Sequence, residues 1–210
     1  MSFIYSDINP EYGSTSVWKV TENASFFQET LNCEVPLEYS KSDKRSLEWL
    51  SSRYIIQKCE DVKSDEIDKD EFGKPHFKTK KKNLSISHSN GYAAVALYDF
   101  PIGIDIQTFV AKIQRIESKY TQKSEVNHYL SFVDKLKALH IIWTIKESVF
   151  KLYGRKELPF KEGILLDKAI FNPKDITTLG RLKKKDDEFS FQSKTILSKD
   201  YCLSQAKFIK

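Results

Sequence analysis

The chain has 210 residues, which is enough for one domain or for two small domains of about 100 residues each. Hydrophobic residues make up 40% and charged residues 30% of the sequence, a balance typical of a soluble globular protein that excludes a disordered chain. The 34 Lys and Arg residues exceed the 29 Asp and Glu residues by five. This mild basic excess favours an anionic ligand or an acidic partner but does not select nucleic acid.

The cysteines and the N-terminal sequence indicate a reducing compartment. Cys33, Cys59 and Cys202 are odd in number and widely spaced, and no Cys-x-x-Cys pair occurs, so neither a disulfide framework nor a zinc site is predicted. The first residues lack a basic segment followed by an apolar run, and no stretch approaches the roughly 20 apolar residues that cross a bilayer. We therefore expect a cytoplasmic protein without a membrane segment.

The first clear element is a helix from Ser42 to Cys59. Its apolar side chains recur at helical spacing, and Ser42 or Asp43 is available as an N-cap; the apolar positions are Leu47, Leu50, Tyr54 and Ile55. Residues 59–83 are dense in charge of both signs and include Gly73 and Pro75, so a loop with at most short strands is expected there.

Residues 83–107 predict three strands joined by tight turns. Apolar and serine residues alternate from Leu84 to Ser87, and the segments YAAVALY and IGIDI follow after Asn90-Gly91 and after residues 99–101. Within the last strand Ile102, Ile104 and Ile106 share one face. Because side chains alternate along a strand, Asp105 and Gln107 project together from the opposite face.

Residues 134–154 form the clearest predicted helix, which ends at Gly154. One narrow polar stripe runs along it, and nearly all other positions are apolar; the stripe comprises His140, Thr144, Glu147 and Lys151. Such a helix must be largely buried, so its charged side chains face a polar cleft or an opposite charge. Lys146 lies within the apolar arc, where it either extends to water or reaches a buried anion.

The flanking segments are less regular. A helix or loop is expected from Lys112 to Leu130, and further strands from Pro159 to Lys210. His76, His128 and His140 lack metal-ligand spacing to one another, so no role is assigned to them.

Asp105 and Glu147 are hard oxygen ligands suited to a divalent cation, and magnesium typically takes one or two protein carboxylates with phosphate oxygens and water. A metal ion flanked by Lys146 and Lys151 is the kind of site that binds a pyrophosphate. The residues alone leave another interpretation open. Glu147 and Lys151 are four residues apart and would also form an ion pair on one helix face, and Asp105 would also cap a turn.

Four ordered motifs extend the interpretation: GKP at 73–75, SISHS at 85–89, IGIDI at 102–106 and WTIKESVFKLYG at 143–154. Each alone is common. Together, with GIDI about 15 residues after SHS and WxxKExxxK about 40 residues later, they form a specific signature. In these motifs the chain resembles the Sfp-type 4′-phosphopantetheinyl transferases.

The resemblance implies an α+β fold of two similar halves, each a small antiparallel sheet packed with a helix, with coenzyme A in the cleft between them. The halves would span residues 1–100 and 101–210, the second carrying the metal site. The implied reaction is the magnesium-dependent transfer of 4′-phosphopantetheine from coenzyme A to a serine of an acyl or peptidyl carrier protein, releasing 3′,5′-ADP. Two-half members are generally monomers, and we expect a monomer.

The resemblance also implies residue roles at the reacting centre. Asp105 and Glu147 match the magnesium-binding carboxylates, and Glu147 would take the proton of the carrier serine. Lys151 matches the lysine that contacts the pyrophosphate and the departing 3′,5′-ADP, and Lys146 matches a second phosphate-binding lysine. Gln107 stands where many members have a third acidic ligand. Its amide oxygen would bind the metal or a ligand water, so we expect magnesium to bind more weakly.

The remaining roles concern the nucleotide. Ser87 and His88 match residues at the nucleotide phosphates, and Lys74 and Pro75 match a segment along the adenosine. The 3′-phosphate would be received by Arg53 together with Lys44 or Arg45, whose alignment is ambiguous by one residue. An alternative for Arg53 is a surface ion pair.

Two other functions remain open. A non-catalytic module that binds coenzyme A or a carrier protein is suggested by Gln107, whereas Asp105, Glu147 and Lys151 argue against it. A nucleic-acid-binding protein is disfavoured because aromatic-rich stacking strands and finger spacing are missing. An acidic carrier protein would dock on the basic residues of the 112–129 region, although a solvated helix face explains them equally well; they are Lys112, Arg115, Lys119 and Lys123.

Overall fold

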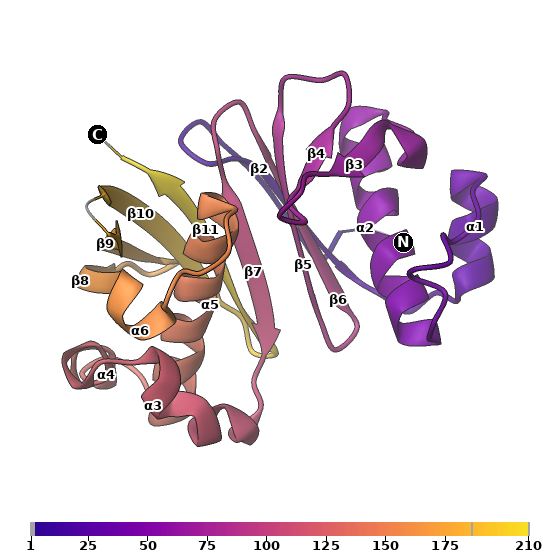
Figure 1. The fold of residues 1–210 in the computed structure, drawn as a ribbon. Coiled ribbons are helices and arrows are strands. Elements are labelled where there is room, and N and C mark those ends of the chain that lie inside the picture. Colours follow the sequence, from indigo (N-terminus) through magenta and orange to yellow (C-terminus); the bar gives the residue numbers. More distant parts are fainter. Residues whose placement is uncertain (1–2, 186, 210) are drawn as a thin grey trace.

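The computed structural model describes residues 3–185 and 187–209, which form two antiparallel sheets with helices packed against them (Figure 1). This confirms the expected mixed α+β fold. The first sheet has six strands in the order β1-β2-β6-β5-β4-β3, and the second has five in the order β7-β11-β10-β9-β8. Within the described ranges, no helix has the length and apolar character needed to cross a membrane.

The first sheet and its helices occupy the chain up to residue 98. They comprise β1 (Tyr5–Asn9), β2 (Gly13–Lys19), α1 (Ala24–Leu31), α2 (Asp43–Glu60), η1 (Ser64–Glu66), β3 (Ile67–Lys69), β4 (Pro75–Phe77), β5 (Asn83–Ser89) and β6 (Tyr92–Tyr98). The predicted helix from Ser42 to Cys59 is α2, and its N-cap is Ser42, whose Oγ accepts a hydrogen bond from the Arg45 backbone N–H at 3.3 Å.

The second sheet begins at residue 103. Its elements are β7 (Gly103–Thr108), η2 (Ala111–Ile116), α3 (Glu117–Tyr120), α4 (Lys123–Leu130), α5 (Lys135–Tyr153), α6 (Phe160–Gly163), β8 (Ile164–Phe171), β9 (Ile176–Lys184), β10 (Asp187–Leu197) and β11 (Tyr201–Phe208). Helix α5 matches the prediction for residues 134–154. Asp134 caps its start, and Gly154 ends it in the left-handed conformation with φ +67°. The strands expected after Pro159 are also confirmed.

Three hydrophobic cores separate four layers. Helices α1 and α2 pack on the outer face of the first sheet, α5 packs on the second, and the two sheets face each other (Figure 1). Strand β6 is apolar throughout because both of its faces are buried. Val95 and Leu97 belong to the core with α2, whereas Tyr92 and Ala94 belong to the core between the sheets.

The strand that carries Asp105 changes sheet. Three strands between residues 83 and 107 are confirmed, but the third, β7, pairs with β11 and not with β6. Its free edge meets serine side chains of β5, which accept backbone N–H groups of β7: Ile104 to Ser85 at 3.0 Å, Ile106 to Ser87 at 3.2 Å and Thr108 to Ser89 at 3.2 Å. Serine hydroxyls here replace the carbonyls of a paired strand, so the motif SISHS forms a seam between the sheets.

Candidate functional site

Asp105 lies buried on β7 and is surrounded by hydrogen-bond donors. Its Oδ1 accepts from Ser87 Oγ at 2.7 Å and lies 2.7 Å from Lys151 Nζ, and its Oδ2 accepts from Gln107 Nε2 at 3.2 Å. These partners come from β5, α5 and β7 itself. The seam between the sheets therefore holds one carboxylate in a fixed position.

Glu147 faces this carboxylate from α5. It is half-buried, and its pKa is raised to about 7, because burial and the charge of Asp105 disfavour its ionised form more than Lys151 favours it. The helix comes this close because β7 has glycine at 103, where a Cβ would overlap the carbonyl oxygen of Ser148. The structure thus brings together four residues expected from the sequence, which are Asp105, Gln107, Glu147 and Lys151.

The other two members of the polar stripe of α5, His140 and Thr144, form hydrogen bonds within the protein. His140 Nε2 accepts the backbone N–H of Val110 at 3.2 Å, and its Nδ1–H donates to the Leu136 carbonyl at 2.8 Å. Thr144 Oγ1 lies 2.8 Å from Ser204 Oγ on β11. Hence only the last two members of the stripe, Glu147 and Lys151, reach the site.

The donor set fits magnesium. Within residues 3–185 and 187–209, no three His, Cys, Asp or Glu side chains converge as a metal-binding group, but magnesium requires only one or two protein carboxylates. Burial, and after it the charge of Asp105, raise the pKa of Glu147, so a divalent cation beside the two carboxylates would favour the ionised form of Glu147. Gln107 Nε2 donates a hydrogen bond to Asp105. The side-chain amide must therefore flip by about 180° before Oε1 can face a metal beside Asp105.

Lys146 does not contribute to this site. Its side chain is completely buried, and Nζ lies 3.0 Å from Glu125 Oε1 on α4 and donates to the Phe160 carbonyl at 3.1 Å. The buried anion that this lysine reaches is therefore Glu125. The expectation that Lys146 binds phosphate is corrected, because a side chain with no exposed surface in this arrangement cannot contact a ligand.

Ser87 and His88 are adjacent in sequence but have different surroundings. Ser87 is buried, donates to Asp105 and accepts from Ile106, so its hydroxyl supports the carboxylate and is not turned to the cleft. The side chain of His88 is 43% exposed, and its Nδ1 lies 3.4 Å from Glu48 Oε1. Of the two, His88 is the residue that a ligand can reach.

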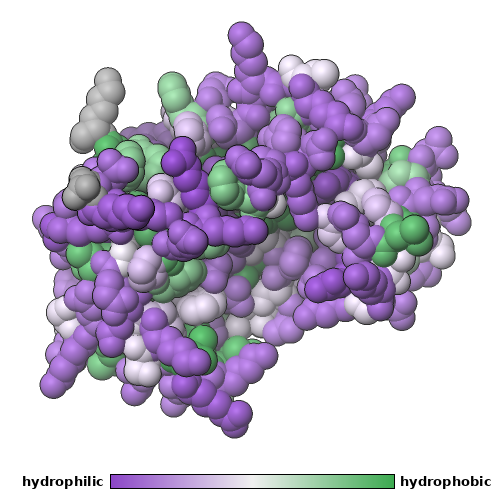
Figure 2. Space-filling model, in the orientation of Figure 1, coloured by the Kyte–Doolittle hydropathy of each residue, from purple (hydrophilic) through white to green (hydrophobic). Residues whose placement is uncertain are grey.

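A cleft borders the site. One cavity of about 520 Å³ is lined by Arg45, Arg53, Pro75 and His88, among others. A second cavity of about 320 Å³ shares Pro75 and extends to Lys74 and Lys151. Figure 2 shows this mainly hydrophilic face, which is hollowed near the middle of the view. Lys44 is exposed and lies 3.8 Å from Glu48, so of the two ambiguous basic residues Arg45 is the one that lines the cleft.

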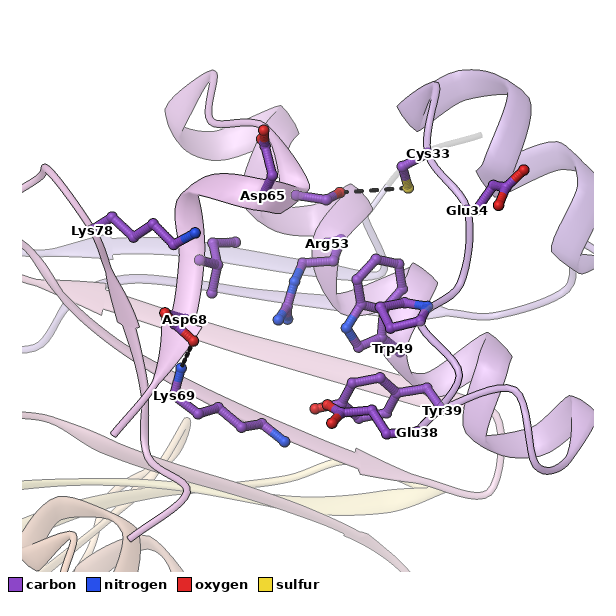
Figure 3. Close-up of a pocket in the computed structure, with 13 residues that line it drawn as sticks. Cys33, Glu34, Glu38, Tyr39, Trp49, Arg53, Asp65, Asp68, Lys69 and Lys78 are labelled. Carbon is purple, nitrogen blue, oxygen red and sulfur yellow. Dashed lines mark hydrogen bonds between the residues drawn. The ribbon is translucent and has the colours of Figure 1, made fainter. Parts of the chain in front are cut away.

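Arg53 is a buried cation without a carboxylate partner among the described residues. It is only 6% exposed, its Nε has no hydrogen-bond partner, and burial lowers its pKa. The guanidinium carbon lies 5.1 Å from the centroid of the Trp49 ring, and Arg53 lines a further cavity of about 450 Å³, whose wall also holds Glu34, Glu38, Asp65 and Asp68 (Figure 3). The alternative of a surface ion pair is therefore wrong. A buried guanidinium in this state favours a bound anion.

Sequence reasoning missed the aromatic wall beside Arg53. Tyr39 and Trp49 have ring centroids 5.8 Å apart, and Lys69 Nζ lies 4.8 Å from the Tyr39 centroid. All three residues line the cavities on both sides of Arg53. The only sequence signal is that Trp49 precedes Arg53 by one helical turn.

Comparison with known proteins agrees with this geometry. Residues 101–206, which include Asp105, Glu147 and Lys151, match the family model described as the 4′-phosphopantetheinyl transferase superfamily. A 4′-phosphopantetheinyl transferase gsp of Aneurinibacillus migulanus is 32% identical over 125 residues. That match covers 55% of this chain and 50% of the relative, so the similarity spans about half the length of the curated protein.

Proposed function

Because the chain belongs to the 4′-phosphopantetheinyl transferase superfamily, we propose that it transfers 4′-phosphopantetheine from coenzyme A to a serine of an acyl or peptidyl carrier protein, releasing 3′,5′-ADP. The observation that carries the proposal is the convergence of Asp105, Glu147 and Lys151 beside a basic cleft. In this proposal residues 1–100 and 101–210 are two similar halves, and the protein acts as a monomer.

The cleft accounts for recognition of the nucleotide. Arg53, which is buried and forms no salt bridge within the described part of the chain, and Arg45 at the cavity wall would bind the 3′-phosphate, where guanidinium groups donate paired hydrogen bonds. His88 would contact the phosphates, and Pro75 would lie along the adenosine. Ser87 would act through Asp105, to which its hydroxyl donates.

Magnesium, when held by Asp105 and Glu147 with the Gln107 amide, supplies positive charge to the pyrophosphate. Glu147 accepts the proton of the carrier serine, directly or through water, and so acts as the general base. The serine oxygen bonds to the β-phosphorus, the bond from that phosphorus to the bridging oxygen breaks, and 3′,5′-ADP leaves with the electron pair. Lys151 hydrogen-bonds to the departing oxygen and offsets its charge.

The carrier protein would dock on the helices that follow β7. Lys112, Arg115, Lys119 and Lys123 are all exposed there. A groove between α3 and α4 has Val126 and Leu130 in its lining, with Lys123 beside them and Lys135 in a salt bridge to Glu117 at 2.9 Å. Carrier proteins are acidic, so the exposed basic residues around this groove suit such a partner.

Intact-mass spectrometry of apo carrier proteins incubated with this protein, coenzyme A and magnesium tests the proposal. We expect the carrier to gain the mass of one phosphopantetheine group with wild type and with Glu29→Gln, an exposed control on α1, but not with Glu147→Gln.

No gain across several carriers, despite measurable coenzyme A binding, would favour a non-catalytic module that binds coenzyme A or a carrier. The observation that favours this second function is Gln107, whose amide donates to Asp105 where many relatives would have a carboxylate. In that case Gln107→Glu is the substitution expected to restore transfer.

A further inference from the structure

Lys74 connects the two halves of the molecule across the cleft. It lies in the loop between β3 and β4, and its Nζ donates at 2.9 Å to the backbone carbonyl of Leu152 in the last turn of α5, 78 residues away in sequence. Leu152 directly follows Lys151, whose Nζ contacts Asp105. The contact therefore lies one residue from the proposed catalytic lysine.

The loop from Asp70 to Lys74, here called the strap, is held together by hydrogen bonds between its first and last residues. Asp70 Oδ1 accepts the backbone N–H groups of Phe72 at 2.9 Å and Lys74 at 2.8 Å, and the Asp70 N–H donates to the Lys74 carbonyl at 3.0 Å. Gly73 takes φ +88°, a conformation that glycine adopts without strain. The strap is thus a preformed unit, and Lys74 carries its contact with α5.

The Lys74 side chain passes directly over Gly154. A Cβ at Gly154 would lie 2.6 Å from Lys74 Cδ, so any side chain there would displace the lysine from its present position. Burial lowers the pKa of Lys74, and its ammonium donates to a carbonyl at the negative end of α5. Because the Lys74 ammonium is bonded to the end of α5, it can hold the β3–β4 loop against that helix.

The strap and α5 enclose the cavity of about 320 Å³. Phe72, Gly73 and Pro75 line it from one side, and Phe150, Lys151 and Gly154 line it from the other. Among the described residues, the hydrogen bond from the Lys74 side chain is the only one that joins the strap to the last turn of α5.

We propose that Lys74 is a positioning residue that ties the strap to α5 and so sets the width of the cleft at Lys151. This rests on the proposed function, since it is the coenzyme A cleft whose width is set. It replaces the expectation that the Lys74 side chain itself contacts the adenosine. Without the tie, the strap separates from α5, and the last turn that carries Lys151 frays.

Hydrogen exchange of the ligand-free protein tests the tie. In Lys74→Met the methylene groups over Gly154 remain while the donor is lost. We expect amides of the strap and of residues 151–154 to exchange about tenfold faster than in wild type, with α2 unchanged. The matched control is Lys81→Met, which removes an exposed lysine and should leave exchange unaltered. Unchanged exchange in Lys74→Met would overturn the proposal.

Gly154→Asn probes the same contact from the other side, because asparagine tolerates the left-handed conformation while its Cβ displaces Lys74. We expect it to speed exchange of the strap in wild type but to add little in Lys74→Met. Additive effects of the two substitutions would show that Lys74 and Gly154 do not act through one contact, against the proposal.

Calorimetry with 3′,5′-ADP separates positioning from direct ligand contact. A positioning role predicts that Lys74→Met weakens binding about three- to tenfold with the same salt dependence as wild type. A reduced salt dependence without faster exchange would identify Lys74 as a phosphate ligand instead. Hydrogen exchange and 3′,5′-ADP binding are both measured without a carrier protein. They therefore test the role of Lys74 even if no transfer to a carrier is detected.

Discussion

At the scale of single residues, the site balances one lysine against two carboxylates. Lys151 is 2.7 Å from Asp105, while Glu147 is left with a raised pKa because it is buried near that same Asp105. Like charges held together in a partly buried place favour proton uptake by one of them. The ligand-free site therefore stores unfavourable electrostatic energy that a bound cation would release.

Because the pKa of Glu147 is raised in the folded protein, we expect the free energy of unfolding to depend on pH. The pKa of Glu147 is about 7 in the folded protein and near 4.5 when unfolded, so folding becomes less favourable as pH rises from about 4.5 to about 7, and the full penalty persists above that. We expect Glu147→Gln to be about 1–2 kcal/mol more stable than wild type at pH 8 without magnesium, after allowing for partial exposure, and equally stable at pH 4.

Urea unfolding at pH 4, 6 and 8 provides the measurement. Added magnesium should stabilise wild type at pH 8 more than Glu147→Gln, because the variant lacks one ligand charge. Equal stabilities of wild type and variant at pH 8 would show that Glu147 carries no such penalty.

At the scale of elements, Asp105 of β7 can meet Glu147 and Lys151 of α5 only because the strand and the helix pack closely. Gly103 lies in a regular strand and does not need a positive φ, so the cost of a side chain there is steric: a Cβ would overlap the Ser148 carbonyl and crowd the Leu152 amide. Both of those groups belong to the backbone of α5, which cannot move like a flexible side chain. Helix α5 must then shift as a unit and carry Glu147 and Lys151 with it.

We therefore expect Gly103→Ala to lower the free energy of unfolding by about 2–3 kcal/mol. Transfer activity should fall more than stability alone explains, because a shifted helix displaces Glu147 from Asp105 even in molecules that remain folded. Chemical unfolding combined with carrier modification at a temperature where the variant is fully folded checks this. Full activity in a folded Gly103→Ala protein would mean that the helix accommodates the methyl group without moving the site.

At the scale of the whole molecule, the core between the sheets makes the two halves depend on each other. Ile104 and Ile106 of β7, and Ile102 just before it, are completely buried against residues of β2 and β6, including Val17. Neither sheet can cover this face alone, so a separated half would expose a broad apolar surface.

Ile104→Ala tests this dependence. We expect a loss of about 2–4 kcal/mol in the free energy of unfolding, whereas Ile170→Ala, at a position 45% exposed, should change it by less than about 0.5 kcal/mol. Unfolding of Ile104→Ala should remain one transition when followed by tryptophan fluorescence and by circular dichroism, because both halves share the weakened core. Two separate transitions would show that the halves fold independently.

Much of the secondary structure could be predicted from the sequence because it depends on short-range geometry. The caps of α2 and α5, the alternation along β5 and β7, and the left-handed end at Gly154 each follow from residues a few positions apart. The same periodicities placed Asp105 and Gln107 on one strand face and Glu147 and Lys151 on one helix stripe. The ordered motifs then suggested a shared site. Residues 1–41 carried no comparable pattern, and β1, β2 and α1 were not predicted.

Only the tertiary structure decided the partners of the buried polar groups. Among the described residues, Lys146 binds Glu125, Ser87 holds Asp105, the Nε of Arg53 has no hydrogen-bond partner, and Lys74 reaches Leu152. Likewise, β7 leaves its neighbours in sequence to pair with β11, near the other end of the chain. A charged side chain in a sequence shows what it can bind but not what is near it. Its partner depends on how distant elements pack, because desolvation makes each buried charge bind whichever group the fold places within reach.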